Sequence, residues 1–369
     1  MFPLQLIIFF LGLALVVWTI FSAIRTFVLP RGEQDTLTRI VFLTTRFLFY
    51  TAVRPMKSFV KRDRVLAYYA PVSLLALPPT WLVLVGLGYT AMFWSLGVPS
   101  WYDAFRISGS SLLTLGFETV QDPLKTFLIF SEATIGLMLV ALLIAYLPTM
   151  YAAFSRRETA VAMLEVRAGS PPSPVQMLER FHRQGGLDRL TDFWEIWEAW
   201  FADIEESHTS LSALVFFRSP QSEHSWVTAS GVVLDAAALT LSTIEIPYDP
   251  QAAYCIRAGY LALRRIADFF YFLYDPNPQP TDLISITRAE YDAVYDELAR
   301  AGVPLKRDRE KAWRDFAGWR VNYDAVLLAL ADLVVAPYAM WSSDRAQGKA
   351  RLRKRRVGML PSLSTHKPE

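Results

Sequence analysis

The sequence predicts an all-α membrane protein with a helical domain outside the bilayer. Of the 369 residues, 53% are hydrophobic, and long apolar runs dominate residues 1–154, whereas charged residues are spread through 155–369. Apolar stretches of about 20 residues are typical of membrane-spanning helices. The charged part is about 190–200 residues long after a short linker, which is enough to close a core of its own. The chain therefore divides into a membrane part and a domain.

Three stretches are long and apolar enough to cross a bilayer. The first covers residues 4–29, with one charge, Arg25, near its end. A cleaved signal peptide does not fit it, because the apolar run is too long, no basic residue precedes it and no small-x-small cleavage site follows. The second span is predicted over residues 74–96 and the third over about 127–154, where Glu132 is the only charge.

The basic residues predict the orientation of these spans. The loop over residues 31–66 is rich in Lys and Arg, whereas the loop over 97–126 contains only Arg106 and Lys125. Short loops rich in basic residues stay on the cytoplasmic side of a membrane. We therefore expect a multi-pass protein of the cytoplasmic membrane, with the amino terminus outside and the carboxyl-terminal domain inside. The single cysteine, Cys255, suits that reducing compartment.

The basic loop contains a helix of its own. Arg39, Arg46 and Arg54 recur at helical spacing, with apolar residues such as Ile40 and Phe47 between them. This pattern predicts an amphipathic helix on the inner membrane surface. A fourth span through this loop would bury Arg39 and Arg46 and is not expected.

The segment between the second and third spans carries the clearest functional signal. This segment begins with a semi-polar stretch of about ten residues that has helical character. It is followed by Thr114, Leu115, Gly116 and Phe117. This order resembles the pore module of the prokaryotic potassium-channel superfamily over residues 67–158. The resemblance implies an outer helix, a pore helix, a filter loop and an inner helix, preceded here by one extra transmembrane helix.

In that family, carbonyl oxygens of such a stretch surround a dehydrated cation. The resemblance implies that residues 114–118 line the ion path, with the Thr114 hydroxyl as the innermost ligand and Glu118 at the outer end. One segment cannot enclose a path, so we expect a homotetramer with three further copies of the chain, surrounded by the lipid bilayer of a prokaryotic cell. The filter would hold K+ or another monovalent cation. No cofactor and no other metal is expected.

Two positions depart from the family pattern. Glu118 stands where the family has its second filter glycine, and Thr119 where it has an aspartate. Glutamate adopts left-handed backbone poorly, and four carboxylates could instead ring the mouth, as in cation pores that select by side chain. The sequence leaves three functions open: a K+-selective channel, a non-selective or other cation channel, and a non-conducting, pore-like scaffold or sensor.

Further residues are expected to support the filter. The family often braces it with a carboxylate on the pore helix, and the corresponding position here is Ser110. Glu132 is a carboxylate inside a span, which indicates a functional site. We expect Glu132 to bond Ser110, Ser111 or the filter backbone, the alternative being a helix cap near the outer interface. Gly136 falls near the hinge glycine of the family and is expected to bend the inner helix.

Residues 159–343 are expected to form a helical cytoplasmic domain. Trp194, Trp197 and Phe201 recur at three- and four-residue spacing, which indicates an apolar helix face. No Gly-x-Gly-x-x-Gly follows a strand pattern, and no cyclic-nucleotide barrel pattern is present. A cytoplasmic ligand or partner protein of this domain is therefore not identified. Helices are predicted over about 174–184, 187–207, 226–245, 249–274, 287–302 and 308–342.

Enzymatic and nucleic-acid-binding functions are not expected. Glu205 and His208 form only a lone Glu-x-x-His pair, and no nucleic-acid-binding motif is found. The basic tail is expected to be disordered, and either merely soluble or attracted to anionic lipid. The predicted parts are a transmembrane helix (1–30), the basic loop (31–66), the pore module (67–158), the cytoplasmic domain (159–343) and the tail (344–369).

Overall fold

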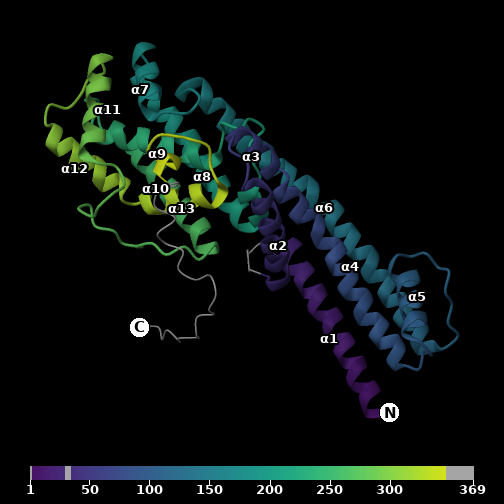
Figure 1. The fold of residues 1–369 in the computed structure, drawn as a ribbon. Coiled ribbons are helices and arrows are strands. Elements are labelled where there is room, and N and C mark those ends of the chain that lie inside the picture. The colour runs from purple at the N-terminus through teal and green to yellow at the C-terminus, as the bar shows by residue number, and fades with distance from the viewer. Residues whose placement is uncertain (1, 30–34, 346–369) are drawn as a thin grey trace, which may run out of the picture.

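The computed structural model describes residues 2–29 and 35–345. Within these residues the chain is helical and contains no strand, which confirms the all-α architecture. Figure 1 shows an elongated helical bundle joined to a broader helical domain. The basic tail lies outside the described residues, apart from Asp344 and Arg345. Among the described residues, three helical segments are long and apolar enough to cross a membrane: Pro3–Phe27, Phe59–Ser95 and Pro123–Ala168.

The first span packs against the second at short range. A Cβ added at Gly12 would lie 2.5 Å from the Gly88 carbonyl oxygen, and one at Gly88 would lie 2.8 Å from the Gly12 carbonyl oxygen. Small residues allow membrane helices to approach this closely. These two glycines therefore set the distance between the two spans. The helices of the bundle are α1 (Phe2–Phe27), α2 (Thr36–Val53), α3 (Phe59–Leu66), α4 (Tyr69–Ser95), α5 (Trp101–Leu112) and α6 (Pro123–Ala168).

The predicted helix in the basic loop is α2. It begins after Asp35, whose carboxylate accepts a hydrogen bond from the Thr38 N–H at 2.9 Å and so satisfies a free donor at the helix start. Val41 is buried against the bundle, whereas Arg39 is exposed. The helix is therefore amphipathic, as its spacing predicted.

The longest helix, α6, belongs to both parts of the molecule. Its first turn is capped by Asp122, which accepts a hydrogen bond from the Lys125 N–H at 3.0 Å. The sequence predicted a span that ends near residue 154, but the helix continues to Ala168. It continues because Val161 and Leu164 are buried in the core of the domain, where apolar burial stabilises the extra turns. The predicted boundary between pore module and domain therefore lies inside one continuous helix.

The core of the domain surrounds α9 (Trp226–Ser242), in which every residue is buried. Trp194, Trp197 and Phe201 pack into the same core, as their spacing predicted. The other elements are α7 (Pro174–Arg183), α8 (Leu190–Ser210), α10 (Pro250–Phe269), α11 (Arg288–Arg300), α12 (Arg309–Arg320) and α13 (Asp324–Val334), with 3-10 turns η1 (Leu187–Arg189) and η2 (Ser212–Phe216).

The prediction of a single helix over residues 308–342 is wrong. The chain breaks between α12 and α13, where Arg320 and Asp324 both turn into the core and pair at 2.8 Å. The second helix ends because Val335 takes left-handed backbone with φ 51 and Pro337, which cannot continue a helix, follows shortly after.

Candidate functional site

The short helix predicted between the second and third spans is α5, which lies beside the ends of α4 and α6 (Figure 1). Ser100 starts it by accepting a hydrogen bond from the Asp103 N–H at 3.0 Å. One face, including Ile107, is buried against the two spans, whereas Tyr102 and Phe105 are exposed. The helix therefore has an apolar side that the single chain does not cover.

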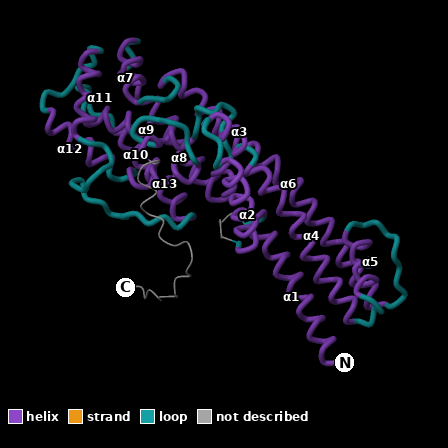
Figure 2. The backbone as a smooth tube through the Cα atoms, in the orientation of Figure 1, coloured by secondary structure: helices purple, strands orange, loops and turns teal. Residues whose placement is uncertain are grey.

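The loop after α5 arches around the outside of that helix (Figure 2), and its first residues are bonded to the end of the helix. The N–H groups of Leu115 and Gly116 donate to the Ser110 carbonyl at 2.8 and 3.3 Å. The turn uses left-handed backbone at Thr114, φ 54, and at Gly116, φ 71. Glycine adopts this conformation freely and threonine does not. The side chains of Leu115 and Phe117 are 61% and 56% exposed, so the apolar side of α5 continues along the loop.

Two serines singled out in the sequence hold the loop and α6 to α5. The hydroxyl of Ser110 accepts a hydrogen bond from the Glu118 N–H at 3.0 Å. The hydroxyl of Ser111 donates to the Ile129 carbonyl at 2.6 Å. Ser110 therefore contacts the predicted filter segment, and Ser111 contacts the predicted inner helix.

The carboxylate of Glu118 is paired within its own chain. It forms an ion pair with Arg106 of α5. The same guanidinium lies 6.0 Å from the centre of the Phe117 ring and 5.9 Å from that of Tyr102. An adjacent opposite charge weakens the field that a carboxylate projects. In this conformation Arg106 balances the charge of Glu118. The expected ring of four carboxylates did not take this ion pair into account.

Glu132 is fully buried where α4, α5 and α6 meet. Its Oε1 accepts a hydrogen bond from the Ser108 hydroxyl at 2.5 Å, and the same hydroxyl lies 3.1 Å from the Gly86 carbonyl oxygen of α4. Ser108 is therefore a partner that the sequence did not single out, while the hydroxyls of Ser110 and Ser111 also bond the Glu118 N–H and the Ile129 carbonyl. The alternative role as a helix cap does not fit, because Glu132 lies well inside α6.

Gly136 lies where α6 passes the end of α5. A Cβ at this position would fall less than 3.0 Å from the Leu112 carbonyl oxygen and 3.3 Å from the Leu112 Cδ1. The helix continues through Gly136 without a break. The structure therefore shows a close backbone contact at the residue predicted to be a hinge.

The far end of α6 carries a fully buried arginine into the junction with the domain. Arg157 donates to the carbonyls of Leu214 and Phe217 at 2.9 and 2.7 Å and pairs with Glu158 at 2.7 Å. His208 Nε2 lies 3.3 Å from the same guanidinium. Burial and the adjacent charge of Arg157 hold the pKa of His208 well below its usual range. The imidazole is therefore neutral at neutral pH.

A second arginine fixes the junction from the other side. Residues 211–218, which include η2, lie between the bundle and the domain, and several of their apolar side chains pack into the bundle core. Arg218 forms an ion pair with Asp63 of α3 and donates to the carbonyls of Val334 and Val335 at 2.6 and 3.0 Å. The segment thus connects α3, α6 and α13.

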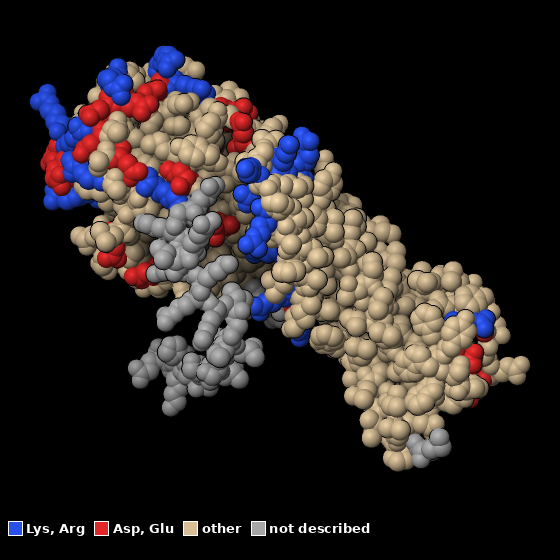
Figure 3. Space-filling model, viewed as in Figure 1, with Lys and Arg blue, Asp and Glu red and all other residues tan. Residues whose placement is uncertain are grey.

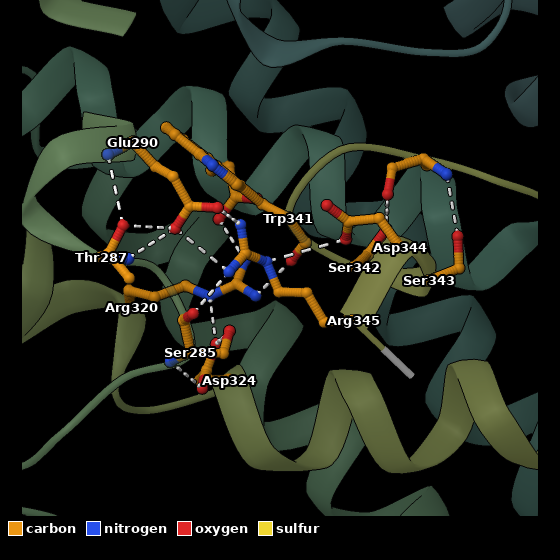
Figure 4. Close-up of polar contacts among 12 residues, drawn as sticks. Ser285, Thr287, Glu290, Arg320, Asp324, Trp341, Ser342, Ser343, Asp344 and Arg345 are labelled. Atoms are coloured by element: carbon orange, nitrogen blue, oxygen red, sulfur yellow. Dashed lines mark hydrogen bonds and ion pairs between the residues drawn. The ribbon is translucent and has the colours of Figure 1, made fainter. Parts of the chain in front are cut away.

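A third polar cluster closes the carboxyl-terminal end of the domain (Figure 4). Arg320 donates to Asp235 at 2.6 Å and also pairs with Asp324. Nearby, Arg345 pairs with Glu290 and donates to the Ser285 carbonyl. Two arginines thus meet three carboxylates, and these contacts hold the residues after α13 against the domain.

Glu205 and His208 do not come together as a metal pair. Glu205 forms an ion pair with Arg265 at the surface, whereas His208 is buried beside Arg157. Within the part of the chain that the structure describes, no group of three or more His, Cys, Asp or Glu residues could hold a metal.

Sequence reasoning missed Arg157 and Arg218 as contact residues. The one local signal was the Arg156-Arg157-Glu158 run that follows the third span. These features define a class: an all-α membrane protein with a short helix and loop between two spans and a helical domain on an extended last span. No family model, curated protein or solved structure matches the chain.

Proposed function

We propose that the chain is one subunit of a homotetrameric, potassium-channel-like cation channel. The supporting observation is the apolar side formed by α5 and the following loop, where Leu115 and Phe117 are exposed in the single chain. Four copies around an axis would bury this side and bring four loops together around one path. The proposed partners are the lipid bilayer and three further copies of the chain.

The proposed path for K+ or another monovalent cation follows the backbone of residues 114–118. The left-handed Gly116 suits a backbone that must present carbonyl oxygens to an ion. The end of α5 at Leu112 would direct the negative end of its helix dipole toward the path. Ser110, Ser111 and the buried Glu132 would brace the loop and the inner helix.

The helical domain would act on the pore through α6. The support is the continuity of that helix from the loop to the domain core, together with the Arg157 contacts at the junction. The distribution of basic residues favours a domain on the cytoplasmic side of the membrane, and the resemblance to prokaryotic channels is the reason for proposing a prokaryotic cytoplasmic membrane. No enzymatic step and no cofactor belong to this proposal.

A non-conducting, pore-like scaffold is the second candidate. It is favoured by the ion pair of Glu118 with Arg106, which fastens each loop to its own helix rather than to an ion or a neighbour. A cation channel without K+ selectivity is a variant of the main proposal, because Glu118 replaces the second glycine of the family pattern.

Cation flux through purified protein in liposomes tests the proposal, under K+ and then Na+ gradients. Glu118→Gly restores the glycine, and Glu118→Gln is the matched control that removes only the charge. Flux of K+ with little Na+ would support a selective channel. Equal fluxes that Glu118→Gly alone shifts toward K+ would assign relaxed selectivity to the backbone at this position. Absence of flux from all three forms, in protein shown to be tetrameric, would refute conduction and favour the scaffold.

A further inference from the structure

The chain leaves α10 through a run of large apolar residues, Phe269 to Tyr274. The sequence predicted a helix through this run, but α10 ends at Phe269, the first residue of the run. Tyr271 takes left-handed backbone with φ 55. Backbone hydrogen bonds to the last turn of α10 fix this conformation. Leu273 is nevertheless 94% exposed. A fixed turn thus presents a leucine and a tyrosine outward.

A series of aromatic contacts connects this turn to the membrane-spanning bundle. The Phe270 ring lies 5.5 Å from the Phe216 ring. Phe216 in turn lies 5.4 Å from Tyr69 and 6.5 Å from Phe42. Tyr69 is the first residue of the spanning helix α4, and Phe42 belongs to the amphipathic helix α2. The turn is therefore close to the end of the bundle that joins the domain.

The domain extends from the bundle on the side of α1, whereas α5 lies on the opposite side (Figure 1). Large apolar side chains are exposed on α1, among them Leu6, Leu11 and Phe21. A spanning helix with such a surface faces lipid. The surface of the bilayer that surrounds α1 therefore extends alongside the domain on this side.

The amphipathic helix α2 indicates what kind of surface lies there. Ile40, Phe47 and Leu48 are exposed on it, next to the exposed Arg39 and Arg54. Figure 3 shows Lys and Arg gathered at the boundary between bundle and domain. Apolar and basic side chains on one helix match the headgroup layer of a membrane, and tyrosines are enriched at the same depth.

The acidic residues near the turn are used in local structure. Asp275 and Asp282 accept hydrogen bonds from backbone N–H groups of their own turns at 2.9 and 2.8 Å. Asp268 accepts one from the Tyr274 hydroxyl at 2.8 Å. In the same loop Leu283 is 99% exposed. The loop therefore offers apolar area, while the basic residues of α2 supply the attraction to phosphate headgroups.

We propose that the turn Phe269–Tyr274 places Tyr271 and Leu273 in the headgroup layer of the domain-side leaflet and so holds the domain against the bilayer. The partner is a lipid surface that contains anionic headgroups. The proposal does not depend on ion conduction, because it uses only the spanning helices and the place of the domain beside them.

Site-specific labelling of the full chain tests this contact. Leu273→Cys carries an environment-sensitive fluorophore, and Ala299→Cys on the exposed side of α11, far from the bundle in Figure 1, is the matched control. The native Cys255 is buried, so the wild-type protein serves as the labelling blank. Each protein is reconstituted in vesicles of phosphatidylcholine with a minority of phosphatidylglycerol. Quenching is measured with nitroxide-labelled lipid and with aqueous iodide.

The expected result is strong quenching by nitroxide lipid and weak quenching by iodide at position 273, with the reverse at position 299. Equal quenching by iodide at both positions would overturn the proposal. Protection of position 273 from both quenchers would also overturn it, since the turn would then contact another protein surface. Leu283→Cys provides a second probe in the same loop and is expected to follow position 273.

Discussion

Replacing Gly136 with alanine distinguishes the two roles that this residue can have in α6. If Gly136 is a free hinge, alanine should raise the stability by about 1 kcal/mol, because alanine is the better helix former. If it is a contact residue, alanine should lower the stability, because the added methyl group would lie less than 3.0 Å from the Leu112 carbonyl oxygen. The sign of the change therefore separates the roles.

The size of the loss follows from what the methyl group meets. The Leu112 oxygen belongs to the backbone of α5, so it cannot rotate away as the end of a side chain would. The end of α5 has to move by roughly 1 Å in a close-packed environment. Overpacking of this kind costs about 1–3 kcal/mol, part of which the better helix propensity offsets. We expect a net loss of about 1–2 kcal/mol and reduced flux, because the displaced helix end carries the loop.

Thermal unfolding of the purified protein in detergent measures the change. Gly109→Ala is the matched control, because Gly109 lies in α5 itself and a Cβ there meets nothing within 4 Å. The Tm of Gly136→Ala should fall by a few degrees, while that of Gly109→Ala stays the same or rises. A Tm of Gly136→Ala above that of the wild type would refute the contact argument and restore the hinge.

Three further outcomes are expected. Arg157→Met should lower the free energy of unfolding by about 3 kcal/mol, since two buried carbonyls lose their donor; an unchanged denaturation midpoint would contradict this role. Because native His208 is neutral and its pKa lies below the ordinary 6.5, the unfolded chain binds one more proton at acidic pH. Stability should then fall below pH 6.5 by up to about 1.4 kcal/mol per pH unit, a slope that pH-dependent melts of His208→Gln should lack. Arg320→Met should cost about 3–5 kcal/mol in chemical denaturation, because Asp235 and Asp324 lose their buried counter-ion, and a loss below about 1 kcal/mol would contradict that.

The elements with local signals could be predicted from the sequence. The spans followed from apolar length, α2 from the spacing of its arginines, and α5 from a short semi-polar stretch between two spans. Trp194 and Trp197 marked the buried face of α8 because helical periodicity is itself a local property. The position of the loop followed from the resemblance to the family pattern, and glycine permits the left-handed backbone at Gly116, whereas nothing in the residue type of Thr114 indicated its left-handed backbone.

The contacts that determine the candidate site could not be predicted in this way. Whether Glu132 contacts Ser108 or Ser110 depends on the rotation of α5 about its own axis relative to α6. The apolar periodicity of the sequence does not determine this rotation precisely enough to distinguish the two serines. Arg157 looks like an interfacial charge, because its carbonyl partners at Leu214 and Phe217 lie far along the chain. Burial of such a charge is acceptable only where those partners are already in place, and residue order alone does not show that.

The continuity of α6 indicates where this helix would bend in the proposed channel. Gly136 is packed against the backbone at Leu112, and Arg157 is bound to the junction, so both ends of the intervening segment are held. Between them lies Pro148, which has no N–H to donate to the carbonyl of Ile144. Helices bend most readily where a proline interrupts the hydrogen-bond ladder. A displacement of the domain would therefore bend α6 near Pro148 and leave its contact with α5 in place. The gate would then lie on the domain side of Pro148, while the loop keeps its shape.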